Sequence, residues 1–196
     1  IGASAGGAVT TGARQVFVGF AAGTATTTGA YNTMMGWRAG YSNTTGAYNT
    51  FLGNYAANSN LTGTQNIAIG NQAAYGGTKA NKYVAIGYDA LYYFGATTTH
   101  EESVGIGYLA GKYATGSYNT FVGSSAGKGN SSAPYSSGGS NTALGYNALL
   151  AFTTGELNVA LGVNALTNVT TGYRNVGIGD RANQGVSTGH SNVSIG

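Results

Sequence analysis

One motif recurs along this chain at a nearly constant interval. The heptapeptide TTGAYNT occurs at residues 27–33 and again at 44–50, and a glycine closes the motif Asn-x-x-aliphatic-Gly after each copy. The same glycine, here called the anchor glycine, recurs at Gly2, Gly19, Gly36, Gly53, Gly70, Gly87, Gly107, Gly123, Gly145, Gly162, Gly179 and Gly196. Eight of the eleven intervals are 17 residues, and the others are 20, 16 and 22. This period predicts a solenoid in which each repeat forms one coil.

The residues just before each anchor glycine have the period-two pattern of a β-strand. Counted from the anchor, position −1 is always aliphatic or Met, and position −3 is always β-branched. Residues two apart on a strand project from the same face, and branched side chains favour strands. The predicted fold class is therefore all-β: a parallel β-roll or β-solenoid of about eleven 17-residue coils.

Small residues mark the interior of the predicted coil. All eleven repeats carry Ala at +3, which indicates a tight buried site. Positions −2 and +4 are never both large: Phe121 precedes Gly127, whereas Ala143 precedes Leu149. We infer that they share one compartment of limited volume, on the strand face opposite to −1 and −3. The strand is then apolar on both faces, so the second face meets another part of the coil or another subunit.

Two polar positions recur before the strand. Position −7 is Gly in nine of eleven repeats, usually after Thr, and predicts a turn in which the glycine adopts a positive φ. Position −4 is Asn in eight repeats, which would lie about 4.8 Å apart and form a ladder of stacked amides. The ladder asparagines are Asn32, Asn49, Asn66, Asn119, Asn141, Asn158, Asn175 and Asn192. Gln15, Tyr83 and Ser103 interrupt the ladder.

The unbroken register predicts a single array over residues 1–196, with no internal domain boundary. The irregular intervals place loop insertions near 97–102 and 128–140. Both ends of the sequence fall at the same point of the motif, so we expect a segment of a longer fibre.

Composition excludes several classes of protein. The chain has 35 glycines, one proline, no cysteine and only 7% charged residues. Its eight basic residues are isolated from one another, so no nucleic-acid partner is expected. The absence of an 18-residue apolar run argues against membrane insertion.

Candidate catalytic residues are sparse. His100, Glu101 and Glu102 form the one titratable cluster, and the only other histidine is His190. This cluster lacks the second histidine of a zinc protease motif and is interpreted as a solvated loop. The glycine-rich segments 105–107 and 127–129 lack the helix of a phosphate-binding loop. We therefore predict no enzymatic activity, no metal and no cofactor.

Aromatic residues also recur at fixed positions. They precede the ladder asparagine or follow the anchor glycine, at Tyr31, Tyr48, Tyr118, Trp37, Tyr88, Tyr108 and Tyr146. Such rings either stack from coil to coil, pack between subunits, or offer a platform on which glycans stack.

The motif NTALGYNAL at residues 141–149, with its relatives at 66–74 and 158–166, resembles a known repeat type. It is similar to the YadA-like head repeats of trimeric autotransporter adhesins and to the TTGxxNTALG repeats of phage tail fibres. The resemblance implies a left-handed, trimeric β-roll on a cell or virion surface that serves attachment. The coils are somewhat longer here than in the adhesin heads, and no neck, stalk, anchor or chaperone motif is recognisable.

Three functions are expected from these patterns. The first is a non-enzymatic extracellular shaft or head for attachment to a host cell, receptor or glycan, with a second and third copy of itself as partners. The second is an ice-binding solenoid whose exposed threonines form a flat row, at Thr11, Thr28, Thr45, Thr62, Thr99 and Thr115. The third is a secreted filament or matrix in which segments join end to end.

Overall fold

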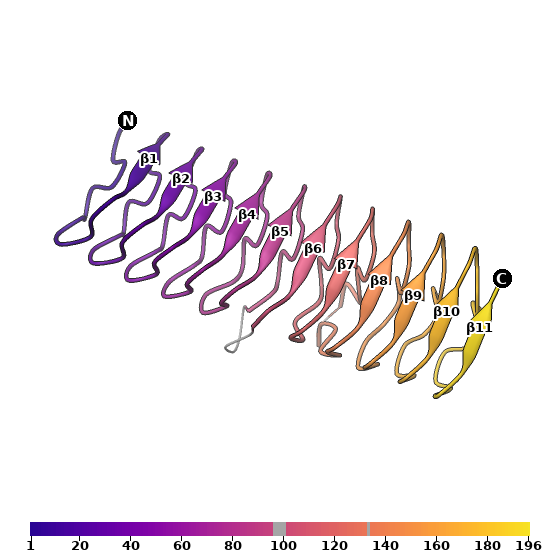
Figure 1. Cartoon of the computed structure of the whole chain (residues 1–196). Helices are drawn as coiled ribbons and strands as arrows, with labels where there is room; N and C mark the ends of the chain where they lie inside the picture. The colour runs from indigo at the N-terminus through magenta and orange to yellow at the C-terminus, as the bar shows by residue number, and fades with distance from the viewer. Residues whose placement is uncertain (96–100, 133) are drawn as a thin grey trace.

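The chain folds as one parallel β-solenoid. The computed structural model describes residues 1–95, 101–132 and 134–196, and these contain no helix. Eleven three-residue strands form a single sheet in chain order, β1 to β11 (Figure 1). They are β1 Val16–Val18, β2 Thr33–Met35, β3 Thr50–Leu52, β4 Ile67–Ile69, β5 Val84–Ile86, β6 Val104–Ile106, β7 Thr120–Val122, β8 Thr142–Leu144, β9 Val159–Leu161, β10 Val176–Ile178 and β11 Val193–Ile195. The predicted all-β solenoid is confirmed.

The sheet pairs equivalent motif positions in every coil. Position −3 lies opposite −3 and −1 opposite −1 in all ten strand pairs, as in Val16↔Thr33 and Val18↔Met35. The solenoid completes about ten turns. The three irregular intervals do not shift this register, because Val84 still pairs with Val104 and Thr120 with Thr142. The extra residues are therefore excluded from the sheet.

The two predicted insertions differ in how much of them is described. Of the first, residues 97–100 lie outside the described residues, and Glu101 forms a parallel bridge with Asn81. In the second, Ser136 forms a parallel bridge with Ala114, so the chain regains its regular path there.

The core is a narrow column inside the coils. Alanine at +3 is fully or almost fully buried in ten coils, and the −2 side chains of β2 to β9 are completely buried except where the residue is glycine. The shared compartment is confirmed. A Cβ at Gly127 would clash with the ring of Phe121, and a Cβ at Gly177 would come within 2.9 Å of Leu166.

The predicted role of the glycine at −7 was wrong. None of these glycines has a positive φ; the anchor glycines do, with φ between +122° and +137° from Gly2 to Gly179. Gly29 shows what position −7 requires. A Cβ there would clash with the carbonyl oxygen of Gly46, so the next coil approaches too closely for any side chain.

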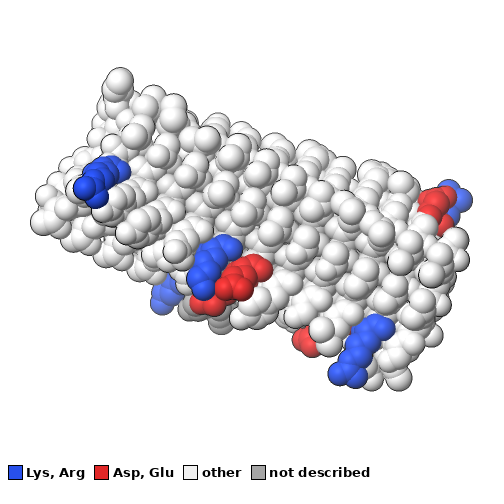
Figure 2. All heavy atoms as spheres, viewed as in Figure 1, with Lys and Arg blue, Asp and Glu red and all other residues white. Residues whose placement is uncertain are grey.

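The −1 and −3 side chains project outward together. We call this surface, formed by both positions of β1 to β11, the strand face. Every one of its side chains is exposed or partly exposed, including Ile67 at 38% and Leu144 at 45%. None is charged, and Figure 2 shows the few charged residues of the visible side in small separate groups along the rod, some of them with opposite charges side by side.

Candidate functional site

The ladder asparagines lie inside the solenoid. Seven of the eight are at most 1% exposed, and Asn192 is exposed. Their Oδ1 atoms accept backbone N–H groups of the next coil, as Asn32 does from Asn49 at 3.0 Å. Their Nδ2 atoms donate to carbonyls of the next coil, as Asn32 does to Gly46 at 2.9 Å. In the last coils an amide also donates to an amide, from Asn158 to Asn141 at 3.1 Å. The ladder thus joins coils and offers no ligand surface.

The interruptions of the ladder keep part of this pattern. Gln15 Oε1 accepts the N–H of Asn32 at 3.2 Å, and Ser103 Oγ accepts that of Asn119 at 3.1 Å. Tyr83 instead fills the position with a fully buried ring, 5.9 Å edge-on from the ring of Phe94. Burial raises the pKa of the Tyr83 hydroxyl far above its ordinary value.

A second, shorter polar ladder was missed by sequence reasoning. At position +7, Asn60 Nδ2 donates to Asn43 Oδ1 at 2.8 Å, and Asn43 Nδ2 donates to Thr26 Oγ1 at 3.4 Å. All three are completely buried. The later coils carry varied residues at this position, so no column-wide pattern reveals the polar segment; they are Gly77, Phe94, Ala114, Asn130, Phe152, Val169 and Val186.

The seven predicted glycan-stacking aromatics all reach the surface, with exposed fractions between 42% and 58%. Five of them stack from coil to coil: Tyr31 on Tyr48 at 4.7 Å, Tyr88 on Tyr108 at 5.5 Å, and Trp37 on Phe20 at 4.6 Å between ring centroids. Each stacked ring gives up one face to its neighbour. Tyr118 and Tyr146 have no ring partner among the described residues, so these two do not stack from coil to coil.

A larger tyrosine cluster lies away from the strands and was not singled out from the sequence. It consists of Tyr55, Tyr75, Tyr92, Tyr93, Tyr113 and Tyr135. Tyr93 stacks on Tyr135 at 4.3 Å and on Tyr113 at 5.7 Å. A hydrogen bond to Tyr135 and partial burial raise the pKa of Tyr93 to about 12. The pairs Tyr75 and Tyr92, and Tyr93 and Tyr113, are spaced by the local repeat interval, a pattern that could have revealed them.

An ion pair lies within this cluster. Lys112 Nζ is 2.7 Å from Asp89 Oδ2. It lies 5.5 Å from the ring centroid of Tyr92 and 5.4 Å from that of Tyr113. Burial acts to lower the pKa of Lys112, but the hydrogen bond and charge of Asp89 outweigh it and raise that pKa. The pair therefore leaves no free cation here.

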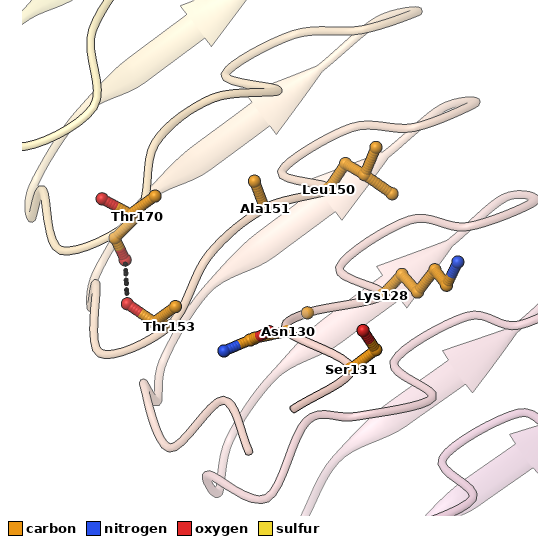
Figure 3. A pocket seen from close by; sticks show the side chains of 8 residues that line it. Lys128, Asn130, Ser131, Leu150, Ala151, Thr153 and Thr170 are labelled. Carbon is orange, nitrogen blue, oxygen red and sulfur yellow. Dashed lines mark hydrogen bonds between the residues drawn. The ribbon is translucent and has the colours of Figure 1, made fainter. Parts of the chain in front are cut away.

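A surface hollow opens beside the second insertion (Figure 3). We call it the loop hollow; its volume is about 410 Å³, and it is lined by Lys128, Gly129, Asn130, Ser131, Leu150, Ala151, Thr153 and Thr170. Lys128 and Leu150 extend to one side of it, whereas Asn130, Thr153 and Thr170 lie on the other. The lining combines the apolar side chains of Leu150 and Ala151 with several polar side chains, as is common in sites for small molecules.

The predicted titratable cluster is only partly described. His100 lies outside the described residues, and Glu102 forms an exposed ion pair with Lys82 at 3.1 Å. This pair raises the pKa of Lys82 through a hydrogen bond and the carboxylate charge. Among the described residues, no three His, Cys, Asp or Glu side chains gather as a metal site would need. The described part also contains no helix long and apolar enough to cross a membrane.

The threonines of the predicted ice-binding row separate into two sets. Thr11, Thr28, Thr45 and Thr62 are exposed, and Thr99 lies outside the described residues. Thr115 is partly buried and donates its hydroxyl proton to the carbonyl of Ser136 at 3.2 Å. It therefore belongs with the neighbouring threonines whose hydroxyls bond along the axis, such as Thr27 to Thr44 at 3.2 Å.

Comparison with known proteins gave no relative. No protein-family model, no curated protein and no solved structure matches this chain.

Proposed function

We propose that this chain is a non-enzymatic segment of an extracellular fibre, a shaft or head that holds an attachment surface away from a cell or virion. The observation that carries the proposal is the strand face, an uncharged and largely apolar strip that accompanies all eleven strands without interruption. The resemblance to trimeric adhesin heads and tail fibres supports a homotrimer of left-handed solenoids.

The size of the strand face supports self-association. Ten intervals of about 4.8 Å give a length of roughly 48 Å, and a three-residue strand is about 10 Å wide. The strip thus covers on the order of 500 Å², comparable to the largest apolar patches of typical monomers, which are often functional. Packing three solenoids about a common axis would bury it along its whole length.

Rigidity follows from the same architecture. Each internal coil makes backbone hydrogen bonds to both neighbours, and the buried ladder asparagines add bonds in the same direction. A load along the axis is therefore shared among many parallel interactions. This suits a mechanical and adhesive role.

Attachment is tested directly with coated particles. We expect fluorescent beads that carry the chain to adhere to host cells, and adhesion to fall at least tenfold after periodate oxidation of cell-surface glycans. Beads coated with heat-denatured chain are the control. Equal adhesion by native and denatured coats would refute the attachment role.

A second function is favoured by one observation. Thr11, Thr28, Thr45 and Thr62 are exposed at equivalent positions of four successive coils, as an ice-binding row requires. Lys79 interrupts the row in the next coil. A measurement of thermal hysteresis decides: freezing-point depression beyond the colligative value supports ice binding, and its absence removes this alternative.

A further inference from the structure

The loop hollow exists because the 22-residue interval departs from the regular coil. At position +6 the tyrosines Tyr93 and Tyr113 are followed by Gly129 and Ala151 in the next two coils. Backbone hydrogen bonds from Tyr113 to Lys128 at 2.8 Å and from Gly129 to Leu150 at 3.0 Å show that these coils are adjacent. The large side chains of Tyr93 and Tyr113 are therefore followed along the rod by the small residues Gly129 and Ala151, and the surface is lower there. We call the surface of Leu150 and Ala151 the floor of the hollow.

The insertion beside the hollow is fixed at two points. The hydroxyl of the fully buried Ser136 accepts the N–H of Asn130 at 2.8 Å and donates to the carbonyl of Phe152 at 2.6 Å. Tyr135, the residue before it, stacks on Tyr93 at 4.3 Å. The wall of the hollow is thus organised before any ligand arrives, which lowers the entropic cost of binding.

Two polar groups of the hollow, on Lys128 and Asn130, are left free for a ligand. The hydroxyls of Thr153 and Thr170 are already used, since they donate to the carbonyls of Thr170 and Ser187 at 3.1 and 3.2 Å. Lys128 has no carboxylate within 4 Å among the described residues, in contrast to Lys82 and Lys112. Asn130 Oδ1 is occupied by the N–H of Ser132 at 3.1 Å, and within the described chain its Nδ2 makes no hydrogen bond. The hollow therefore presents one unpaired cation and one free amide donor on the same coil, beside the apolar side chains of Leu150 and Ala151 on the next coil.

We propose that the loop hollow binds an acidic saccharide. A pyranose ring combines an apolar face with hydroxyls at its rim, which matches the floor of Leu150 and Ala151 and the donors beside it. The single ammonium of Lys128 suits one carboxylate. A volume of about 410 Å³ lies at the small end of ligand sites, about 300–1,000 Å³.

The position of the hollow is compatible with assembly. Its residues occupy positions +5 to +8, about half a coil away from the strands, so packing through the strand face leaves it accessible. The inference rests on the proposed attachment function, for which it names the ligand class.

Binding is measured on a panel of immobilised glycans that contain uronic or sialic acid, alongside neutral glycans. The wild-type chain should be retained by acidic glycans only. Lys128→Gln should weaken retention at least tenfold, and Ala151→Trp, which fills the floor, should abolish it. The matched controls Lys79→Gln and Ala25→Trp, the latter at the same +6 position of a regular coil, should bind as the wild type does.

The outcomes separate the two proposals. Failure of the wild type to bind any acidic glycan, or unchanged binding by Ala151→Trp, overturns the saccharide site. If beads that carry Ala151→Trp adhere to cells as well as wild-type beads do, attachment stands and uses another surface. If acidic glycans bind through the hollow but wild-type beads do not adhere to cells, attachment itself fails.

Discussion

Individual glycines serve two physical purposes in this solenoid. The anchor glycines adopt a φ that side chains rarely tolerate and also lie against the backbone of the next coil, whereas the glycines at −7 are needed because of that close approach alone. Sequence alone showed both columns but assigned the positive φ to the wrong one. The regular recurrence within the chain shows that a glycine is required at both positions. The structure is needed to tell an unusual φ from a close approach of the neighbouring backbone.

Close approach at position −7 has a measurable cost. Gly29→Ala should lower the free energy of unfolding by about 1–3 kcal/mol, because its Cβ meets backbone of the next coil that cannot move independently. Gly185→Ala is the matched control, since a Cβ there has no heavy atom within 4 Å and should change stability by less than about 0.5 kcal/mol. Equal unfolding midpoints in urea for the two variants would refute this explanation.

The buried hydroxyl of Tyr83 is a stability defect. It has no hydrogen-bond partner among the described residues, so Tyr83→Phe should raise the free energy of unfolding by about 1 kcal/mol. Because the folded-state pKa is raised above the ordinary 10.0, the wild type should also lose stability as the pH rises above about 10.

Urea titrations at pH 8 and pH 11 test both effects of Tyr83. Tyr83→Phe should be more stable at pH 8 and should lose less between the two pH values than the wild type does. Tyr48→Phe, at a ring that is 58% exposed, should behave as the wild type. A destabilised Tyr83→Phe variant would mean that the hydroxyl is satisfied.

At the scale of the single coil, volume is conserved between positions −2 and +4. Phe121→Ala should cost about 3–5 kcal/mol, and Gly127→Leu about 1–3 kcal/mol because its side chain meets the Phe121 ring. The double variant imitates the natural pair Ala143 and Leu149, and Leu149 already adopts φ +52°. Its loss should be smaller than the sum of the single losses by about 1–3 kcal/mol. Strict additivity in a thermal or urea unfolding cycle would show that the compartment is not shared.

Much of each coil could be predicted from the sequence. The strand positions, the buried alanine and the shared compartment follow from period-two patterning and paired volumes, which repetition makes visible eleven times over. The left-handed backbone at −5 and +2 could not be predicted from the sequence, because residues as different as Tyr48, Gln65 and Arg38 adopt it. The loop hollow could not be predicted either, since it is formed by an insertion that occurs once and by the small size of Gly129 and Ala151.

At the scale of the whole molecule, two parts of the surface have different proposed roles. In the proposed trimer, the strand face supplies the contact between copies, and the loop hollow lies on the side that stays accessible. Five of the seven aromatics expected to stack with glycans stack on a ring of a neighbouring coil, so they reinforce the rod. The proposed ligand site lies where the repeat is broken.

Sedimentation of the intact chain and two variants tests whether the strand face joins copies of this protein. The wild type should sediment as a trimer of about 59 kDa, three times the 19.6 kDa chain. Ile67→Asp, on the strand face, should shift it to monomer. Leu61→Asp, at position −9 outside the strand face and equally exposed at 38%, should leave the trimer intact. A wild-type monomer, or a mass unchanged by Ile67→Asp, would contradict the account.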